Sequence, residues 1–109
     1  MARPARIVFT DSADSDSSFI YADLHGKAGM PTVVKYRALF RRLYERLADF
    51  PESGAPRPKL GPDISIGIVS PYIVIYRYGE ADNSVIVLRI VHGRRKITGK
   101  LLLTGTGSK

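Results

Sequence analysis

Three strand-like segments in the second half of the chain limit the folds that it can adopt. Isoleucine alternates with other residues over residues 64–69, residues 72–78 (YIVIYRY) are almost all apolar or aromatic, and residues 84–92 (SVIVLRIVH) are rich in β-branched side chains. Only short turns, at residues 70–71 and 79–83, separate them. Connections this short favour hairpins, so the sequence predicts an antiparallel meander.

A strongly amphipathic helix precedes these strands. Over residues 31–49, apolar side chains recur every three or four positions and form one face, while arginines and a lysine occupy the others. A more weakly patterned helix is expected over residues 12–27, after a short strand at residues 5–10 and an N-cap at Asp11 or Ser12. The order β-α-α-β-β-β predicts an α+β fold, in which an α-helical hairpin packs on one face of a curved antiparallel sheet.

The length and composition are those of one folded domain. The 109 residues are 44% hydrophobic and 25% charged, as in ordinary soluble proteins. We expect a domain core over about residues 5–97 and a C-terminal extension, 98–109, with a flexible end. The chain has no cysteine, which excludes disulfides, thiolate metal sites and a cysteine nucleophile. His25 and His92 lie on unrelated elements, so we expect no metal and no cofactor.

The net charge is strongly positive. A formal charge of +7, from 17 Lys and Arg against 10 Asp and Glu, favours an acidic partner such as nucleic acid, an anionic membrane surface or an acidic protein. No run approaches the roughly 18 apolar residues of a membrane span. We therefore expect a soluble, cytoplasmic protein without a membrane partner. The densest cationic cluster, Arg94, Arg95 and Lys96, follows a buried strand and Gly93.

Two arginines interrupt the apolar pattern of the last two strands. Side chains of a strand point alternately to its two faces. In the first of these strands, Arg77 stands between Tyr76 and Tyr78. In the second, Arg89 is expected on the same face as Val85, Val87 and Val91, whereas Ile86, Leu88, Ile90 and His92 are expected on the other face. If both arginines share the face opposite the helices, they form a cationic site beside the Arg94 turn. The alternative is that they reach solvent or pair with Asp and Glu at the rim.

Four segments resemble the RelE/ParE toxins of bacterial type II toxin–antitoxin systems, and specifically the ParE branch. They are LADFPESG (47–54), PRPKLG (56–61), PYIVIYRY (71–78) and VLRIVHGRRKI (87–97). The resemblance implies a small toxin that a ParD-like antitoxin neutralises by wrapping the helical hairpin and the sheet, in a toxin–antitoxin hetero-oligomer. It also implies inhibition of DNA gyrase and thus of replication. RelE relatives instead cut mRNA on the ribosome.

The residues favour binding over RNA cleavage. A nuclease needs a base, a phosphate-holding cation and an acid; the candidates would be His92, Arg89 and Arg94, with Glu52 or Asp63 as base if the loop folds toward the sheet. However, no aromatic residue follows Tyr78 to stack a substrate base, and arginine does not surrender a proton. We expect His92 to be structural, and direct nucleic-acid binding not to be the primary activity; a ribosome-dependent endoribonuclease is the alternative.

These arguments define two candidate surfaces. The expected target-facing residues are the cations around the end of the last strand: Arg89, Arg94, Arg95 and Lys96. The expected antitoxin-facing residues are apolar and basic groups of the hairpin together with one strand arginine: Phe19, Ile20, Leu24, Tyr36, Arg37, Phe40 and Arg77.

Overall fold

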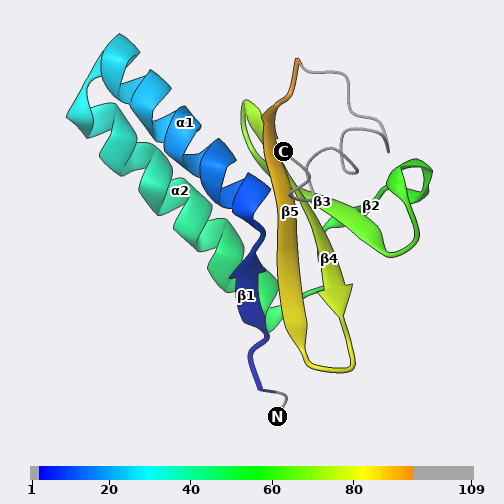
Figure 1. The fold of residues 1–109 in the computed structure, drawn as a ribbon. Coiled ribbons are helices and arrows are strands. Elements are labelled where there is room, and N and C mark those ends of the chain that lie inside the picture. Colours follow the sequence, from blue (N-terminus) through cyan, green and yellow to red (C-terminus); the bar gives the residue numbers. More distant parts are fainter. Residues whose placement is uncertain (1–2, 95–109) are drawn as a thin grey trace.

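A computed structural model describes residues 3–94 of the chain. Two helices form an antiparallel hairpin beside a five-stranded sheet of order β1-β5-β4-β3-β2 (Figure 1). The elements are β1 (Arg6–Phe9), α1 (Asp11–Ala28), α2 (Met30–Asp49), β2 (Ala55–Pro56), the 3₁₀ turn η1 (Pro58–Leu60), β3 (Ile64–Val69), β4 (Tyr72–Gly79) and β5 (Ser84–His92). The predicted α+β class with a helical hairpin is confirmed.

The sheet is mixed rather than wholly antiparallel. β3, β4 and β5 form the expected antiparallel meander, but β1 pairs parallel with β5, with Arg6 opposite Ser84 and Phe9 opposite Val87. A parallel partner requires a long connection, and the helical hairpin together with the meander supplies it. The Pro-rich connector also contributes β2, a two-residue strand at the other edge.

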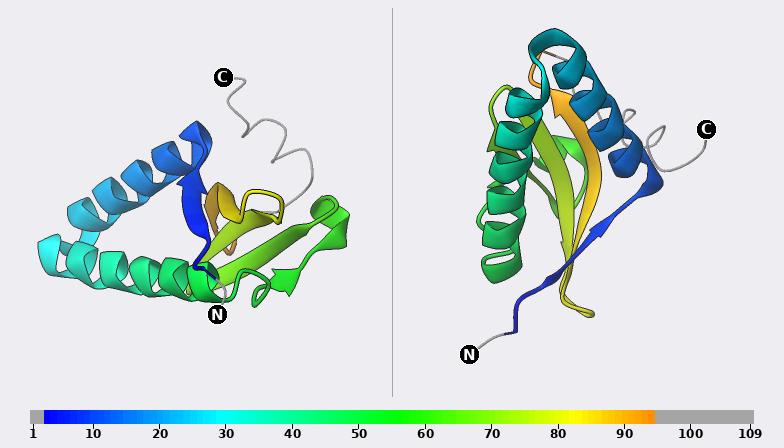
Figure 2. Two further views of the ribbon diagram at one scale, coloured as in Figure 1. Left: turned by 90° about the horizontal axis from the view of Figure 1, so that it is seen from below. Right: turned by 90° about the vertical axis from the view of Figure 1, so that its left-hand side faces the viewer.

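The apolar face of α2 forms most of the helix side of the core. Its buried residues are Val33, Phe40, Leu43 and Leu47, and the hairpin lies on one side of the sheet (Figure 2). Gly67 of β3 permits close packing, because a Cβ at that position would lie 2.9 Å from Leu43 Cδ1. A smaller apolar cluster occupies the opposite sheet face, which we call the far face.

The helical hairpin begins and turns at specific residues. Thr10, one residue before the expected cap, is the N-cap of α1, and its side chain accepts a hydrogen bond from the Ala13 N–H. Gly29 joins α1 to α2 at φ +83°, a conformation that glycine adopts readily. Among residues 3–94, neither helix is long and apolar enough to cross a membrane.

Candidate functional site

The end of β5 is a tightly bonded turn. The Gly93 N–H donates to the Pro71 carbonyl at 2.7 Å, and the Arg94 N–H donates to His92 Nδ1 at 3.1 Å. A Cβ on Gly93 would lie 3.0 Å from the Pro71 oxygen, so a side chain there would crowd the bond. The turn leaves Arg94 exposed at the end of the sheet. Arg95 and Lys96, and the expected extension 98–109, lie outside the described residues.

His92 supports this turn. Its Nδ1 acts as an acceptor, which requires that nitrogen to be unprotonated, and its ring packs edge-on against Tyr72 at 5.7 Å between centroids. Burial raises the pKa of the Tyr72 hydroxyl above its usual value. The pocket that His92 lines with Gly93 and Arg94 contains no Asp or Glu within the part of the chain that the structure describes.

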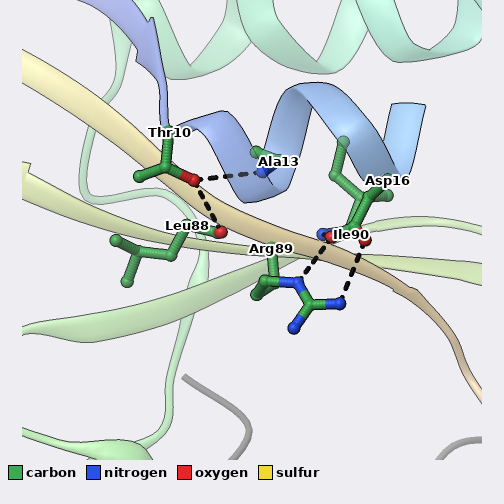
Figure 3. A network of polar contacts seen from close by, with 6 residues as sticks. All are labelled: Thr10, Ala13, Asp16, Leu88, Arg89 and Ile90. Atoms are coloured by element: carbon green, nitrogen blue, oxygen red, sulfur yellow. Dashed lines mark hydrogen bonds and ion pairs between the residues drawn. The ribbon is translucent and has the colours of Figure 1, made fainter. Parts of the chain in front are cut away.

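Arg89 is held by α1 rather than directed at solvent. Its Nε and Nη2 donate to Asp16 Oδ2 and Oδ1 at 2.7 and 3.0 Å, and Asp16 Oδ2 also accepts the Ile90 N–H at 2.9 Å (Figure 3). The two side chains are only 13% and 16% exposed. The expectation that Arg89 faces a target is therefore corrected: its guanidinium already has an acidic partner, as the alternative interpretation allowed.

Thr10 extends the same attachment along the edge of β5. Its hydroxyl donates to the Leu88 carbonyl at 2.9 Å (Figure 3), and its N–H donates to the Val87 carbonyl at 3.1 Å. Past its pairing with β1, β5 would otherwise present unpaired backbone groups to solvent. The start of α1 thus covers this edge with polar contacts. Asp16 was not predicted as a contact residue. In the sequence it is only an acid within a Ser/Asp-rich stretch, which does not indicate its partner.

A β-bulge changes which side chains of β5 share a face. The register pairs Ile75 with Arg89 but Tyr76 with Val87, so the alternation shifts at Leu88. Arg77 and Arg89 do share the far face, as the conditional hypothesis required. The prediction that Ile86, Leu88 and Ile90 lie on one face of the sheet is wrong, because Ile90 packs in the helix-side core whereas Leu88 packs on the far face.

Arg77 lies at a groove formed with the Pro-rich connector. Glu52, Asp63 and Glu80 line the same groove, which has a volume of about 790 Å³. The connector thus folds toward the sheet, but its acids and His92 line different pockets. The Tyr76 hydroxyl fixes the connector, because it accepts the Gly54 N–H at 3.0 Å and donates to the Pro51 carbonyl at 2.9 Å.

Part of the expected antitoxin surface is buried. Ile20 and Phe40 belong to the core, so the expectation that they meet a partner is corrected: they hold the hairpin together and onto the sheet. Leu24 and Tyr36 are half-buried and pack against that core. Arg77 lies on the far face, separated by the sheet from the hairpin residues with which it was grouped.

Other hairpin residues do present a surface. Phe19 of α1 is 72% exposed, and the exposed Arg37 places its guanidinium 5.1 Å from the Tyr21 ring centroid. Met30 and Val34, one turn apart on α2, are also exposed apolar side chains. Sequence analysis missed these two; the available signal was that both stand outside the periodic apolar stripe.

Comparisons with known proteins identify the family of this chain. Residues 7–97 match the family described as ParE toxin of type II toxin-antitoxin system, parDE. The chain belongs to the ParE toxin family. A relative, Toxin ParE3 of Caulobacter vibrioides, is 27% identical to this ParE-family chain over 96 residues, which cover 88% of this chain and 94% of the relative.

Solved structures show the same fold. The match to the chromosomal ParDE system from P. aeruginosa has a TM-score of 0.68 and 19% identity, and covers 84% of this chain and 98% of that one. The toxin–antitoxin complex RelBE2 from Mycobacterium tuberculosis gives 0.60 and 20%, covering 82% and 98%. A mutant of E. coli toxin RelE in the free state gives 0.61 and 14%, covering 94% of each chain. At these identities the likeness shows the fold alone.

Proposed function

We propose that this ParE-family protein inhibits DNA gyrase, and so replication, by binding it in the cytoplasm. The observation that carries the proposal is the family match, which extends through the end of β5 into the cationic segment at residues 94–96. The structure supports a role in binding for this end of the sheet. Arg94 is exposed beyond a turn that is fixed by two hydrogen bonds, and Arg95 and Lys96 follow it in the sequence.

Three observations favour binding over catalysis. His92 uses Nδ1 to hold the turn, Arg89 is paired with Asp16, and the acids Glu52 and Asp63 line a groove that does not include His92. General acid–base cleavage of RNA needs a base and an acid within reach of one phosphate. The described residues do not bring such a pair together around His92.

We further propose that a ParD-like antitoxin covers the helical hairpin in a hetero-oligomer. Phe19, Met30 and Val34 offer apolar anchor points, and Arg37 offers a cation for an acidic residue of the partner. An amphipathic segment with apolar anchors and acids suits such a surface. Two of the similar structures come from ParDE and RelBE toxin–antitoxin systems, which is consistent with this proposal.

Two assays on the purified protein separate the proposal from its alternative. In the first, gyrase supercoils relaxed plasmid with increasing toxin, and we expect inhibition that added antitoxin relieves. In the second, toxin is added to a cell-free translation reaction and mRNA ends are mapped, and we expect no cleavage. Unimpaired gyrase together with mRNA cut on ribosomes would replace the proposal with a RelE-like endoribonuclease.

A further inference from the structure

The exposed surface of α2 is strongly basic. Its exposed cations are Lys35, Arg37, Arg41, Arg42 and Arg46. The only acids of this helix are Glu45 and Asp49. The ion pairs of residues 3–94 lie within α1 and between α1 and β5, so the described part of the chain gives the cations of α2 no salt-bridge partner. Uncompensated charge of this density favours an anionic partner.

Helical geometry divides these cations between two sides of α2. At 3.6 residues per turn, Lys35, Arg42 and Arg46 lie within roughly 40° of one another around the helix axis. The other side holds Arg37, whose guanidinium lies 5.1 Å from the Tyr21 ring centroid of α1. The first group, which we call the basic row, therefore faces away from α1. With a rise of about 1.5 Å per residue, the row is roughly 17 Å long.

The two sides of α2 differ in their apolar content. Met30 and Val34, the large apolar residues of α2 that are exposed, lie within roughly 60° of Arg37. Apolar anchors beside a cation suit a protein partner, because protein interfaces are organised around a buried apolar centre. The basic row has no exposed apolar anchor within α2. Charge alone is enough to hold a phosphate backbone, so the row suits nucleic acid better than a protein.

The side chains of the row can reach a phosphate backbone. The Lys35 ammonium lies 5.8 Å from the Tyr36 ring centroid, and this contact with a ring leaves its N–H donors available. Arg42 and Arg46 carry planar guanidinium groups, which match phosphate with two parallel hydrogen bonds. Phosphates of one DNA strand are about 3.4 Å apart along the axis. A row of this length therefore spans about five of them.

We propose that the basic row binds the phosphate backbone of duplex DNA, as a second contact surface separate from the turn at the end of β5. The binding does not depend on base sequence, because phosphates carry no base identity. Inhibition of gyrase in solution does not require it; the row instead concentrates the toxin on the molecule on which gyrase acts. The row is argued from α2 alone, and only the choice of DNA over RNA rests on the proposed function.

The salt dependence of DNA binding tests the proposal. Anisotropy of a labelled 20-base-pair duplex is titrated with full-length toxin between 50 and 200 mM KCl, without gyrase or antitoxin. Each phosphate contact contributes about −0.9 to the slope of log K against log salt concentration. Replacing the row, in Lys35→Ala with Arg42→Ala and Arg46→Ala, should make that slope shallower by about 2.7 and weaken binding at least tenfold at 50 mM.

A charge-matched control separates the row from net charge. Arg57→Ala with Lys59→Ala and Arg77→Ala removes three exposed cations from the connector and β4, and should change the slope by less than one. Alanine favours helix, so the row variant should keep the urea midpoint of the wild type.

Three results would overturn the proposal. An unchanged slope and affinity for the row variant, or an equal loss in the control, would show that the row does not hold DNA. Tighter binding of an RNA duplex of the same sequence would reassign the row to RNA. A row variant that binds DNA normally but loses the antitoxin would assign the row to the antitoxin. The DNA titrations contain no gyrase, so they succeed or fail separately from the proposed function.

Discussion

Asp16 of α1 and Arg89 of β5, 73 positions apart in sequence, form a two-point ion pair whose carboxylate also binds the Ile90 N–H. This contact attaches the first helix to the edge of the sheet where β1 has ended. It explains how a helix with little apolar periodicity keeps a defined position, because polar contacts from Thr10 and Asp16 supplement its small buried face.

The first prediction concerns this ion pair. Asp16→Ala leaves a mostly buried guanidinium and a backbone N–H without their acceptor, so we expect a loss of about 2–4 kcal/mol in the free energy of unfolding. Urea denaturation measures it. Asp14→Ala, which removes an exposed acid from the same helix, should cost about 0.5 kcal/mol. Equal losses for the two variants would show that the pair does not hold α1.

The second prediction contrasts two glycines. A Cβ at Gly54 would collide with the Tyr76 hydroxyl and lie 2.6 Å from the Ile66 carbonyl, whereas nothing lies within 4 Å of one at Gly26. We therefore expect Gly54→Ala to destabilise the protein by about 1–3 kcal/mol. Gly26→Ala, in α1, should stabilise it by about 0.5–1 kcal/mol. Thermal unfolding of both variants checks the signs, and a neutral Gly54→Ala would mean that the connector is loosely held.

The third prediction concerns alkaline pH. Burial raises the pKa of Tyr44, and also of Tyr72 and Tyr76, above the usual value of 10.0. The unfolded chain ionises these hydroxyls first, so their contribution to stability is complete below about pH 10 and is lost as the pH rises further. Urea unfolding between pH 8 and 11.5 should show a fall that begins near 10. Tyr44→Phe should make that fall shallower, and a slope as steep as the wild type's would contradict the assignment.

The fourth prediction separates support from catalysis at His92. Asparagine can place a side-chain oxygen where Nδ1 accepts the Arg94 N–H, so His92→Asn should keep the turn and most of the inhibitory activity. His92→Ala loses the acceptor and should weaken inhibition several-fold. A general acid or base would instead make both variants inactive, by about 10²–10⁴-fold. Dose–response curves for growth inhibition in cells, which report on either activity, distinguish the two patterns.

Local patterns predicted most elements, while long-range pairing was predicted poorly. Residues 64–69 and 84–92 form strands with the expected bounds, and the second helix begins one residue earlier than expected. The parallel pairing of β1 was not predicted, because the sequence of a four-residue strand does not indicate which strand it pairs with. The bulge at Leu88 was missed because strict alternation assumes an uninterrupted ladder.

In the candidate site, too, local features were predicted from the sequence and long-range contacts were not. The glycine turn that leads to Arg94 was expected from sequence, and the structure shows the Pro71 contact that makes the glycine useful. The role of Arg89 depended on Asp16, which is distant in sequence, and the burial of Ile20 and Phe40 depended on how the hairpin lies on the sheet. Periodicity identifies an apolar face but does not say whether the sheet or a partner covers it.

The central claim is that the cations beyond β5 bind gyrase, and one measurement tests it most directly. The concentration of toxin that half-inhibits supercoiling is compared between wild type and the double variant Arg94→Ala with Arg95→Ala. Loss of charge-assisted contacts worth about 1.5–3 kcal/mol each predicts at least a roughly tenfold increase, with an unchanged urea midpoint and unchanged antitoxin binding. The control, Arg41→Ala with Arg42→Ala on the exposed side of α2, should inhibit like wild type. A folded Arg94/Arg95 variant that inhibits gyrase as strongly as wild type would contradict the account.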